Sequence, residues 1–130
     1  MRAILLAAGF GTRLKPITDK TPKCLVQIKN KPLLEIWLDN LFNSGVESFL
    51  INTHYLPDQV ETFIKNSIYK NNITIIKEKK LAGTAGTLLN NIKFFQYEDG
   101  LLIHADNYST ESIKTFISAH KKRPANCLMS

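Results

Sequence analysis

The sequence lacks a long apolar run. No apolar stretch approaches the ~20 consecutive residues that a membrane-spanning helix needs, so we expect neither a membrane span nor a membrane partner. A secretory signal peptide is not expected either, because only Arg2 precedes the short N-terminal apolar run and no small-residue cleavage site follows it. We interpret the first residues, MRAILLAAG, as a strand of a soluble protein.

Cysteine is scarce as well. The two cysteines, Cys24 and Cys127, lie far apart in the sequence, and neither belongs to a CxxC motif or a metal-ligand cluster. This pattern does not indicate a disulfide framework or a structural zinc site. We therefore predict two free thiols and a cytoplasmic location, where thiols stay reduced.

Acidic residues are outnumbered, with 17 Lys and Arg against 11 Asp and Glu, which gives a formal net charge of +6. Such an excess favours anionic partners, such as nucleotides, phosphorylated sugars or nucleic acid. The cations are scattered, however, and the densest group, Lys121-Lys122-Arg123, closes a predicted helix, where cations suit the negative end of the helix dipole. We therefore predict a small phosphorylated ligand and no nucleic-acid partner.

The 130 residues are enough for one domain with a real core, but not for two. Apolar runs of strand length alternate with helical patterns, which predicts an α/β fold with a mostly parallel sheet and helices on both faces. We expect strands at 2–8, 46–53, 73–76 and 101–106, with a fifth starting at 127. We expect helices at 33–43, from 57 to about 68, at 87–92 and at 110–122, the last capped by Ser109.

Polar segments follow the predicted strands. They are the loop after the first strand, residues 52–55 after the second and Asp106-Asn107 after the fourth, with the glycine-bearing segment 83–86 expected nearby. Ligands of open parallel sheets bind at the carboxyl ends of the strands, so we expect the functional site there.

The loop after the first strand begins with Gly9 and Gly11, which make a GxG pattern. A dinucleotide-binding fingerprint needs a third glycine three residues later, where Leu14 stands, and the GxxxxGK[ST] pattern of a P-loop is absent. Taken alone, the two glycines fit a tight structural turn equally well.

Basic residues in the same loop favour a phosphate site. Backbone amides from Gly11 to Arg13 are candidates to hold phosphate oxygens, since glycines let the backbone approach a ligand closely. Arg13 offers a planar fork for phosphate and Lys23 a point charge. The alternative is that both are ordinary surface cations.

Residues 6–35 read LAAGFGTRLKPITDKTPKCLVQIKNKPLLE. This stretch closely resembles the opening signature of sugar-phosphate nucleotidyltransferases, LAAGxGTRLxPxTxxxPKxLxxxxxKPxLE, with nearly every fixed position filled. Weaker similarities follow: NTHY at 52–55, Glu78 ahead of LAGTAGTL, and Ala105-Asp106 where the family has Gly-Asp. The resemblance implies a Rossmann-like three-layer nucleotidyltransferase fold, of which residues 1–130 would be the truncated, nucleotide-binding N-terminal part.

The resemblance also implies a reaction, in which an NTP and a sugar 1-phosphate give an NDP-sugar and pyrophosphate. Such chemistry depends on positioning and charge neutralisation rather than on a covalent nucleophile. The family roles fall on the following residues: Leu6, Ala7, Ala8 and Gly9 along the nucleoside; Gly11, Thr12 and Arg13 on the triphosphate; Lys23 on the reacting phosphates, with Arg13 and Lys23 as the catalytic pair; Glu78 and Gly83 at the base; and Asp106 on Mg²⁺.

The base and the sugar are less well defined. A carboxylate at Glu78 can accept from the N1–H and N2–H₂ groups of guanine, whereas uracil and thymine offer one N–H, so we favour GTP with mannose 1-phosphate. Thymidylyl or uridylyl transfer to glucose 1-phosphate is the alternative. Glu78 as a surface carboxylate and Asp106 as a turn cap are the simpler interpretations of these two residues.

Two other classes of protein are weighed against this enzyme. A non-catalytic regulatory domain would be expected to lose the loop cations, but Arg13 and Lys23 are both present. A Rossmann dehydrogenase would need the third glycine, and an acidic residue where Asn52 and Thr53 end the second strand. In the resembled family a second metal-binding carboxylate and most sugar-binding residues lie further along the chain. The oligomeric state, including a homo-oligomer, stays open.

Overall fold

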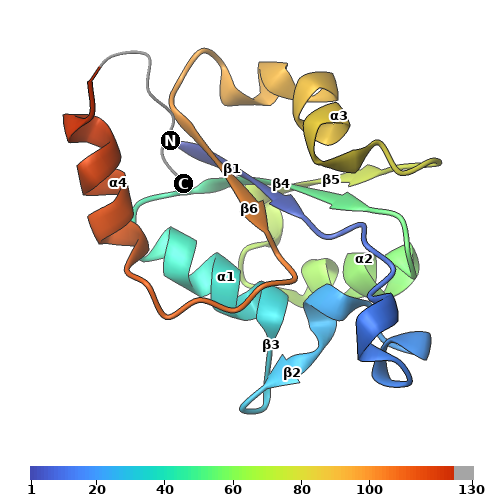
Figure 1. The fold of residues 1–130 in the computed structure, drawn as a ribbon. Coiled ribbons are helices and arrows are strands. Elements are labelled where there is room, and N and C mark those ends of the chain that lie inside the picture. The colour runs from blue at the N-terminus through green and yellow to red at the C-terminus, as the bar shows by residue number, and fades with distance from the viewer. Residues whose placement is uncertain (125–130) are drawn as a thin grey trace.

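The computed structural model describes residues 1–124, and four parallel strands form its main sheet (Figure 1). The strands are β1 (Arg2–Leu6), β4 (Ser48–Thr53), β5 (Ile73–Lys77) and β6 (Gly100–His104). Their order is β5-β4-β1-β6, so β1 lies between β4 and β6. The strand expected to start at residue 127 lies outside the described residues. Within residues 1–124, no helix has both the length and the apolar character needed to cross a membrane.

Helices cover both faces of this sheet, which confirms the α/β prediction. α1 (Leu33–Phe42), α2 (Pro57–Asn66) and α4 (Ile113–Lys122) contribute to the larger core on one face. α3 (Gly83–Asn90) and a 3-10 helix at Ile92–Phe95 cover the other face. In Figure 1, α3 lies on the opposite side of the sheet from α1 and α2.

The alternation of side chains along β1 explains this layering. Ala3 and Leu5 belong to the larger core, whereas Ile4 packs with Leu50 and Phe95 on the face covered by α3. All three β1 side chains are fully buried. Burying one leucine or isoleucine contributes about 1.5–3 kcal/mol, so a strand that is apolar on both faces is most stable at the centre of a sheet.

A short hairpin follows the glycine-rich loop. It pairs β2 (Gln27–Ile28) with β3 (Lys31–Pro32), and a 3-10 turn at Lys23–Leu25 precedes it. Lys31 Nζ donates to Asp39 Oδ2 on α1, and Tyr69 Oη donates to Asp39 Oδ1 at 2.6 Å, which raises the pKa of Tyr69 to about 12. Asp39 thus anchors the hairpin to the core.

Several predicted boundaries were wrong by a few residues. β1 ends at Leu6 instead of residue 8, and β6 ends at His104, so Asp106 lies in the turn beyond the strand. α3 begins at Gly83, so the segment expected to be a glycine loop is the first turn of a helix. α4 begins at Ile113 and is capped by Ser112, whose Oγ accepts from the Thr115 amide at 3.2 Å.

Gly100, at the start of β6, has no room for a side chain. A Cβ atom there would lie 2.1 Å from Cδ1 of Phe95, whose ring is buried. We expect Gly100→Ala to lower the free energy of unfolding by about 1–3 kcal/mol, measured by urea titration, because a packed core resists added volume. Adding Phe95→Leu should recover part of this loss in a double-mutant cycle. Purely additive losses would contradict the proposed clash.

Cys24 is 1% exposed, and burial raises the pKa of its thiol to about 12. Because the thiolate is the reactive form, we expect Cys24 to resist Ellman's reagent at pH 8 in the folded protein. A Cys127→Ser background isolates this thiol. Full labelling in urea provides the control, and rapid labelling of the folded protein would show that Cys24 is accessible.

Candidate functional site

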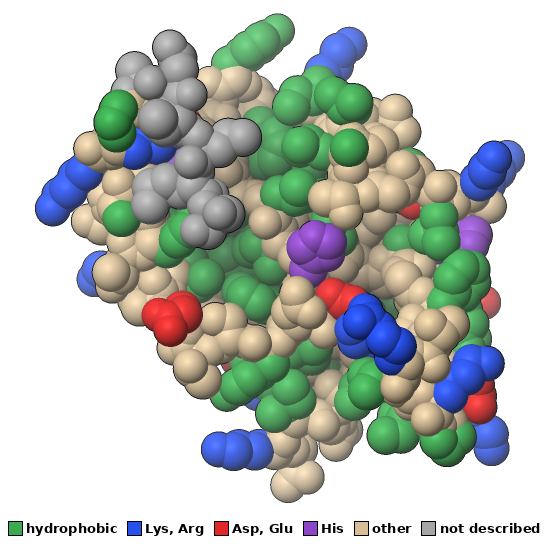
Figure 2. Space-filling view, in the orientation of Figure 1, with side chains coloured by type: hydrophobic (Ala, Val, Ile, Leu, Met, Phe, Trp, Pro, Cys, Tyr) green, Lys and Arg blue, Asp and Glu red, His purple; other side chains and the backbone are tan. Residues whose placement is uncertain are grey.

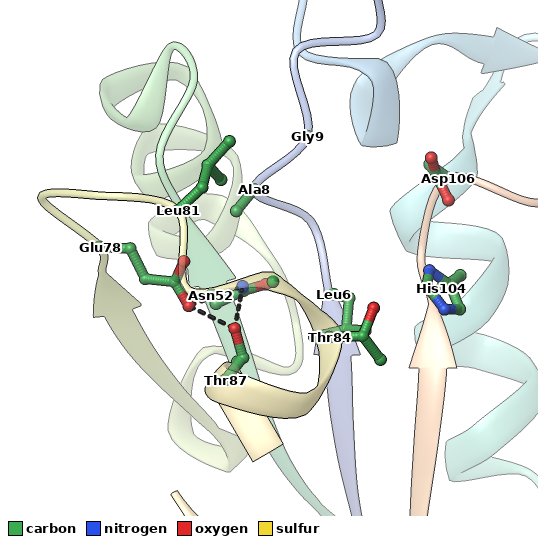
Figure 3. A pocket seen from close by; sticks show the side chains of 11 residues that line it. Leu6, Ala8, Gly9, Asn52, Glu78, Leu81, Thr84, Thr87, His104 and Asp106 are labelled. Atoms are coloured by element: carbon green, nitrogen blue, oxygen red, sulfur yellow. Dashed lines mark hydrogen bonds between the residues drawn. The ribbon is translucent and has the colours of Figure 1, made fainter. Parts of the chain in front are cut away.

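A cavity of about 200 Å³ lies at the carboxyl ends of β1, β4 and β6 (Figure 3). The residues that line it are Leu6, Ala8, Gly9, Asn52, Glu78, Leu81, Gly83, Thr84, Thr87, His104 and Asp106. They come from the ends of three strands, the segment after β5 and the first turns of α3. This is the edge at which open parallel sheets bind ligands, as the sequence predicts.

The buried amide of Asn52 joins two walls of the cavity. Leu6 pairs with Asn52 at the last position of the β1–β4 ladder. Beyond it, the Ala7 amide donates to Asn52 Oδ1 at 2.8 Å, so a side chain replaces the backbone partner where β1 leaves the sheet. Asn52 Nδ2 donates to Glu78 Oε1 at 3.0 Å and to Thr87 Oγ1 at 3.2 Å. Asn52 is only 3% exposed.

Glu78 is tied into this wall instead of standing free on the surface. Its Oε1 also accepts from Thr87 Oγ1 at 2.5 Å, and its Oε2 accepts from the Ala82 amide at 3.1 Å. Burial raises the pKa of Glu78. Hydrogen bonds from Asn52, Thr87 and the Ala82 amide lower it, and the electrostatic effect of His54 lowers it further. Together these outweigh burial, so the pKa of Glu78 lies below its ordinary value. The side chain is therefore an anion at neutral pH.

Lys23 and Asp106 form an ion pair on the β6 side of the cavity. Lys23 Nζ lies 2.8 Å from Asp106 Oδ2, and the two side chains are 19% and 31% exposed. The turn that carries Asp106 is held in place, because the Ala105 amide donates to the Leu6 carbonyl at 3.1 Å and Trp37 Nε1 donates to the Asn107 carbonyl at 2.7 Å. The pair thus sits on a fixed turn.

The residues around Asp106 suit magnesium better than a metal ion that protein side chains coordinate completely. No group of three or more His, Cys, Asp or Glu side chains within residues 1–124 is placed to hold a metal ion. Mg²⁺, however, keeps several waters and binds through one or two carboxylates together with substrate phosphates. Asp106 lines the cavity and fits the role of one such carboxylate.

The side chain of Thr18 holds the glycine-rich loop in place. Gly11 has φ of 65°, a left-handed conformation that favours glycine, and a Cβ there would lie 2.9 Å from Thr18 Cγ2. Thr18 is fully buried and donates from Oγ1 to the Gly11 carbonyl at 2.7 Å. The Tyr55 hydroxyl donates to the Thr18 carbonyl at 2.8 Å, and the Phe10 ring packs on Tyr55. The loop is therefore attached to the segment after β4.

The structure brings together only part of the predicted site. Glu78 and Asp106 line the cavity, with Leu6, Ala8, Gly9 and Gly83. Gly11, Thr12 and Arg13 are not among the lining residues; Thr12 and Arg13 are exposed in a 3-10 turn at Thr12–Leu14. Ala7 is buried in the core and reaches the site only through its amide. The ligand roles assigned to all these residues stay predictions.

Several lining residues were not among the predicted site residues. Leu81, Thr84 and Thr87 line the cavity from the segment after β5 and from α3, and His104 lines it from the end of β6. Asn52 was predicted only to lie near this edge. Thr87 is buried, and a buried hydroxyl needs hydrogen-bond partners, but the sequence alone does not show this burial.

The comparison with protein families agrees with this geometry. Residues 2–130 match the family model described as nucleotidyl transferase. The chain belongs to that family.

Named relatives cover a range of substrates. The choline-phosphate cytidylyltransferase of Streptococcus pneumoniae is 35% identical over 108 residues, which are 83% of this chain and 45% of that protein. The mannose-1-phosphate guanyltransferase of Saccharomyces cerevisiae is 39% identical over 90 residues, 68% of this chain and 25% of that protein. The chain thus spans between a quarter and a half of the length of these two curated relatives.

A solved structure of HddC from Yersinia pseudotuberculosis, complexed with GMP-PN, superposes with a TM-score of 0.77 and 28% identity. The match covers 91% of this chain and 53% of that one. The solved structure of the CTP:phosphocholine cytidylyltransferase of Streptococcus pneumoniae superposes with a TM-score of 0.72 and 32% identity, over 86% of this chain and 47% of that one. The fold of the described residues is therefore that of nucleotidyltransferase structures, which confirms the predicted architecture.

The Thr18 hydroxyl can be tested without changing the shape of the loop. We expect Thr18→Val to lower the free energy of unfolding by about 0.5–1.5 kcal/mol, because the Gly11 carbonyl loses this donor and keeps only the Leu14 amide. Amide exchange across residues 10–19 should quicken. Thr18→Ser retains the hydroxyl and is the matched control, in which the rate of amide exchange should stay close to that of the wild type. A Thr18→Val protein as stable as the wild type would contradict a stabilising role for this hydrogen bond.

Proposed function

We propose that this chain carries the nucleotide-binding part of an enzyme that transfers a nucleoside monophosphate from an NTP to a sugar 1-phosphate, with release of pyrophosphate. The observation that carries the proposal is the ion pair of Lys23 with Asp106, whose carboxylate lines the cavity and lies 2.8 Å from Lys23 Nζ. A cation beside a carboxylate is what a triphosphate and its Mg²⁺ need, because phosphate oxygens take the cation while the carboxylate takes the metal.

In this proposal, Lys23 leaves Asp106 when a nucleotide binds and neutralises charge on the reacting phosphates. Arg13 and the backbone amides of Gly11 and Thr12 would meet the triphosphate from the glycine-rich loop, where Thr12 and Arg13 are exposed and accessible to a ligand. Asp106 would hold Mg²⁺ together with the nucleotide phosphates. The bound metal would supply charge neutralisation at the phosphate oxygens.

The chemical step balances without a covalent enzyme intermediate. A phosphate oxygen of the sugar 1-phosphate attacks the α-phosphorus, and the bond from that phosphorus to the oxygen bridging the β-phosphate breaks in line, releasing pyrophosphate. The contribution of this chain is to align the triphosphate and to lower its charge. Lys23 is the residue best placed for the second task.

For the base, we favour GTP, with mannose 1-phosphate as the acceptor. Glu78 is an anion in the cavity wall and accepts hydrogen bonds only, which suits a base that presents an N–H group. Because Oε1 already accepts from Asn52 and Thr87, Oε2 is the oxygen left to accept one N–H of the base, such as N1–H of guanine. The names of the yeast relative and of the HddC complex with GMP-PN support this choice. Thymidylyl or uridylyl transfer to glucose 1-phosphate is the alternative, and the pneumococcal relative named for cytidylyl transfer adds CTP to the test panel.

The test measures pyrophosphate release by the full-length protein with Mg²⁺, five NTPs and a panel of sugar 1-phosphates. We expect turnover, fastest with GTP and mannose 1-phosphate, and a fall in kcat of about 10²–10³-fold for Lys23→Ala. Lys20→Ala removes the same charge from the same exposed loop and should change kcat by less than about twofold.

Two outcomes would overturn the proposal. One is the absence of pyrophosphate release from every NTP and sugar 1-phosphate pair. The other is equal activity of Lys23→Ala and Lys20→Ala, which would give Lys23 no role beyond its net charge.

A further inference from the structure

The donor and the acceptor of each hydrogen bond around Asn52 can be assigned without ambiguity. The Ala7 amide can only donate, so the Asn52 atom that it contacts at 2.8 Å must be the carbonyl oxygen Oδ1. The amide orientation of Asn52 is thereby fixed, and its NH₂ group faces Glu78 and Thr87. The other face of this network is the cavity itself, which Asn52 lines with both partners (Figure 3).

The Thr87 hydroxyl accepts one hydrogen bond in this network and donates another. Its Oγ1 accepts from Asn52 Nδ2 at 3.2 Å, and a hydroxyl has only one hydrogen to donate. That hydrogen goes to Glu78 Oε1, 2.5 Å away. Thr87 is 1% exposed, and its buried hydroxyl has both a donor, Asn52, and an acceptor, Glu78.

Glu78 is the end of the chain of hydrogen bonds. Oε1 accepts from both Asn52 and Thr87, which occupies both of its lone pairs. Oε2 accepts only from the Ala82 amide among the described contacts and keeps one lone pair. A carboxylate held in this way can accept one further N–H and repels a carbonyl oxygen in the same place.

We propose that Asn52 and Thr87 are positioning residues that hold the Glu78 carboxylate in one orientation, and that they thereby set the base preference of the nucleotide site. The inference rests on the proposed function, since it takes Glu78 as the contact to the base. The loop that meets the phosphates belongs to a different part of the chain and is fastened by Thr18.

The two positioning residues have separable effects. Asn52 also binds the Ala7 amide, so its replacement disturbs the end of β1 as well as Glu78. The Thr87 hydroxyl contacts only Asn52 and Glu78 among the described side-chain contacts. Thr87 is therefore the cleaner position for an experiment.

The experiment measures the dissociation constants of GTP, dTTP, UTP, CTP and ATP for the full-length protein by titration calorimetry. The readout is the ratio of the largest to the smallest of the five dissociation constants. We expect Thr87→Val, which keeps the shape and removes the hydroxyl, to lower this ratio by about tenfold, because Glu78 loses its shortest hydrogen bond. Thr87→Ser retains the hydroxyl and should keep the wild-type ratio.

A purely structural role for Thr87 would weaken all five nucleotides equally and leave the ratio unchanged, which would overturn the inference while the proposed function stands. Wild-type binding without any base preference would overturn it in the same way. Binding of none of the five would overturn the proposed function and the inference together.

Thr87→Ala is a second variant in case Thr87→Val does not fold. It removes the same hydroxyl without a β-branched apolar side chain, and alanine is a good helix former at this position in α3. The same loss of base preference is expected from it. Retention of the preference in a folded Thr87→Ala protein would contradict the proposal.

Discussion

The hydrogen bond from the Ala7 amide to Asn52 Oδ1 marks the point where the sheet ends and the site begins. Up to Leu6, β1 is held by backbone ladders to both neighbours. One residue later the backbone needs a new partner, because an unpaired buried amide is costly, and the side chain of Asn52 supplies it. The chain can then leave the sheet and turn into the glycine-rich loop without losing a hydrogen bond.

The side chain of Asn52 also determines the position of the opposite wall of the cavity. With its oxygen taken by Ala7, Asn52 has only donors left to offer, and these need acceptors. Glu78 and Thr87 provide them, so α3 and the segment after β5 are drawn toward the end of β1. The position of Glu78, the proposed base contact, therefore depends on the Ala7 amide, which lies several strands earlier in the sequence and needs Asn52 as its hydrogen-bond acceptor.

The sequence predicted the layers well, and it predicted the sheet edge at which the cavity lies, since strands apolar on both faces require a covered sheet and parallel strands end together. It predicted the start of α3 poorly. The glycine at the start, Gly83, has φ of 72° and reads as a loop residue, but the helix begins there. Thr87 was not predicted because its role depends on how α3 packs against β4, which no local pattern specifies.

Glu78 shows why charge patterns along the sequence mislead at a strand end. It is flanked by Lys77 and by two further lysines, which suggests a surface carboxylate paired with them. The structure instead pairs Lys77 with Glu61 of α2 at 2.8 Å, and Glu78 bonds to Asn52 and Thr87. Adjacent residues of an extended chain point to opposite sides, so neighbours in sequence do not share partners. No ion pair joins Glu78 to a lysine among the described residues. In the proposed function its carboxylate would contact the base, while Lys23 would neutralise the phosphate charge.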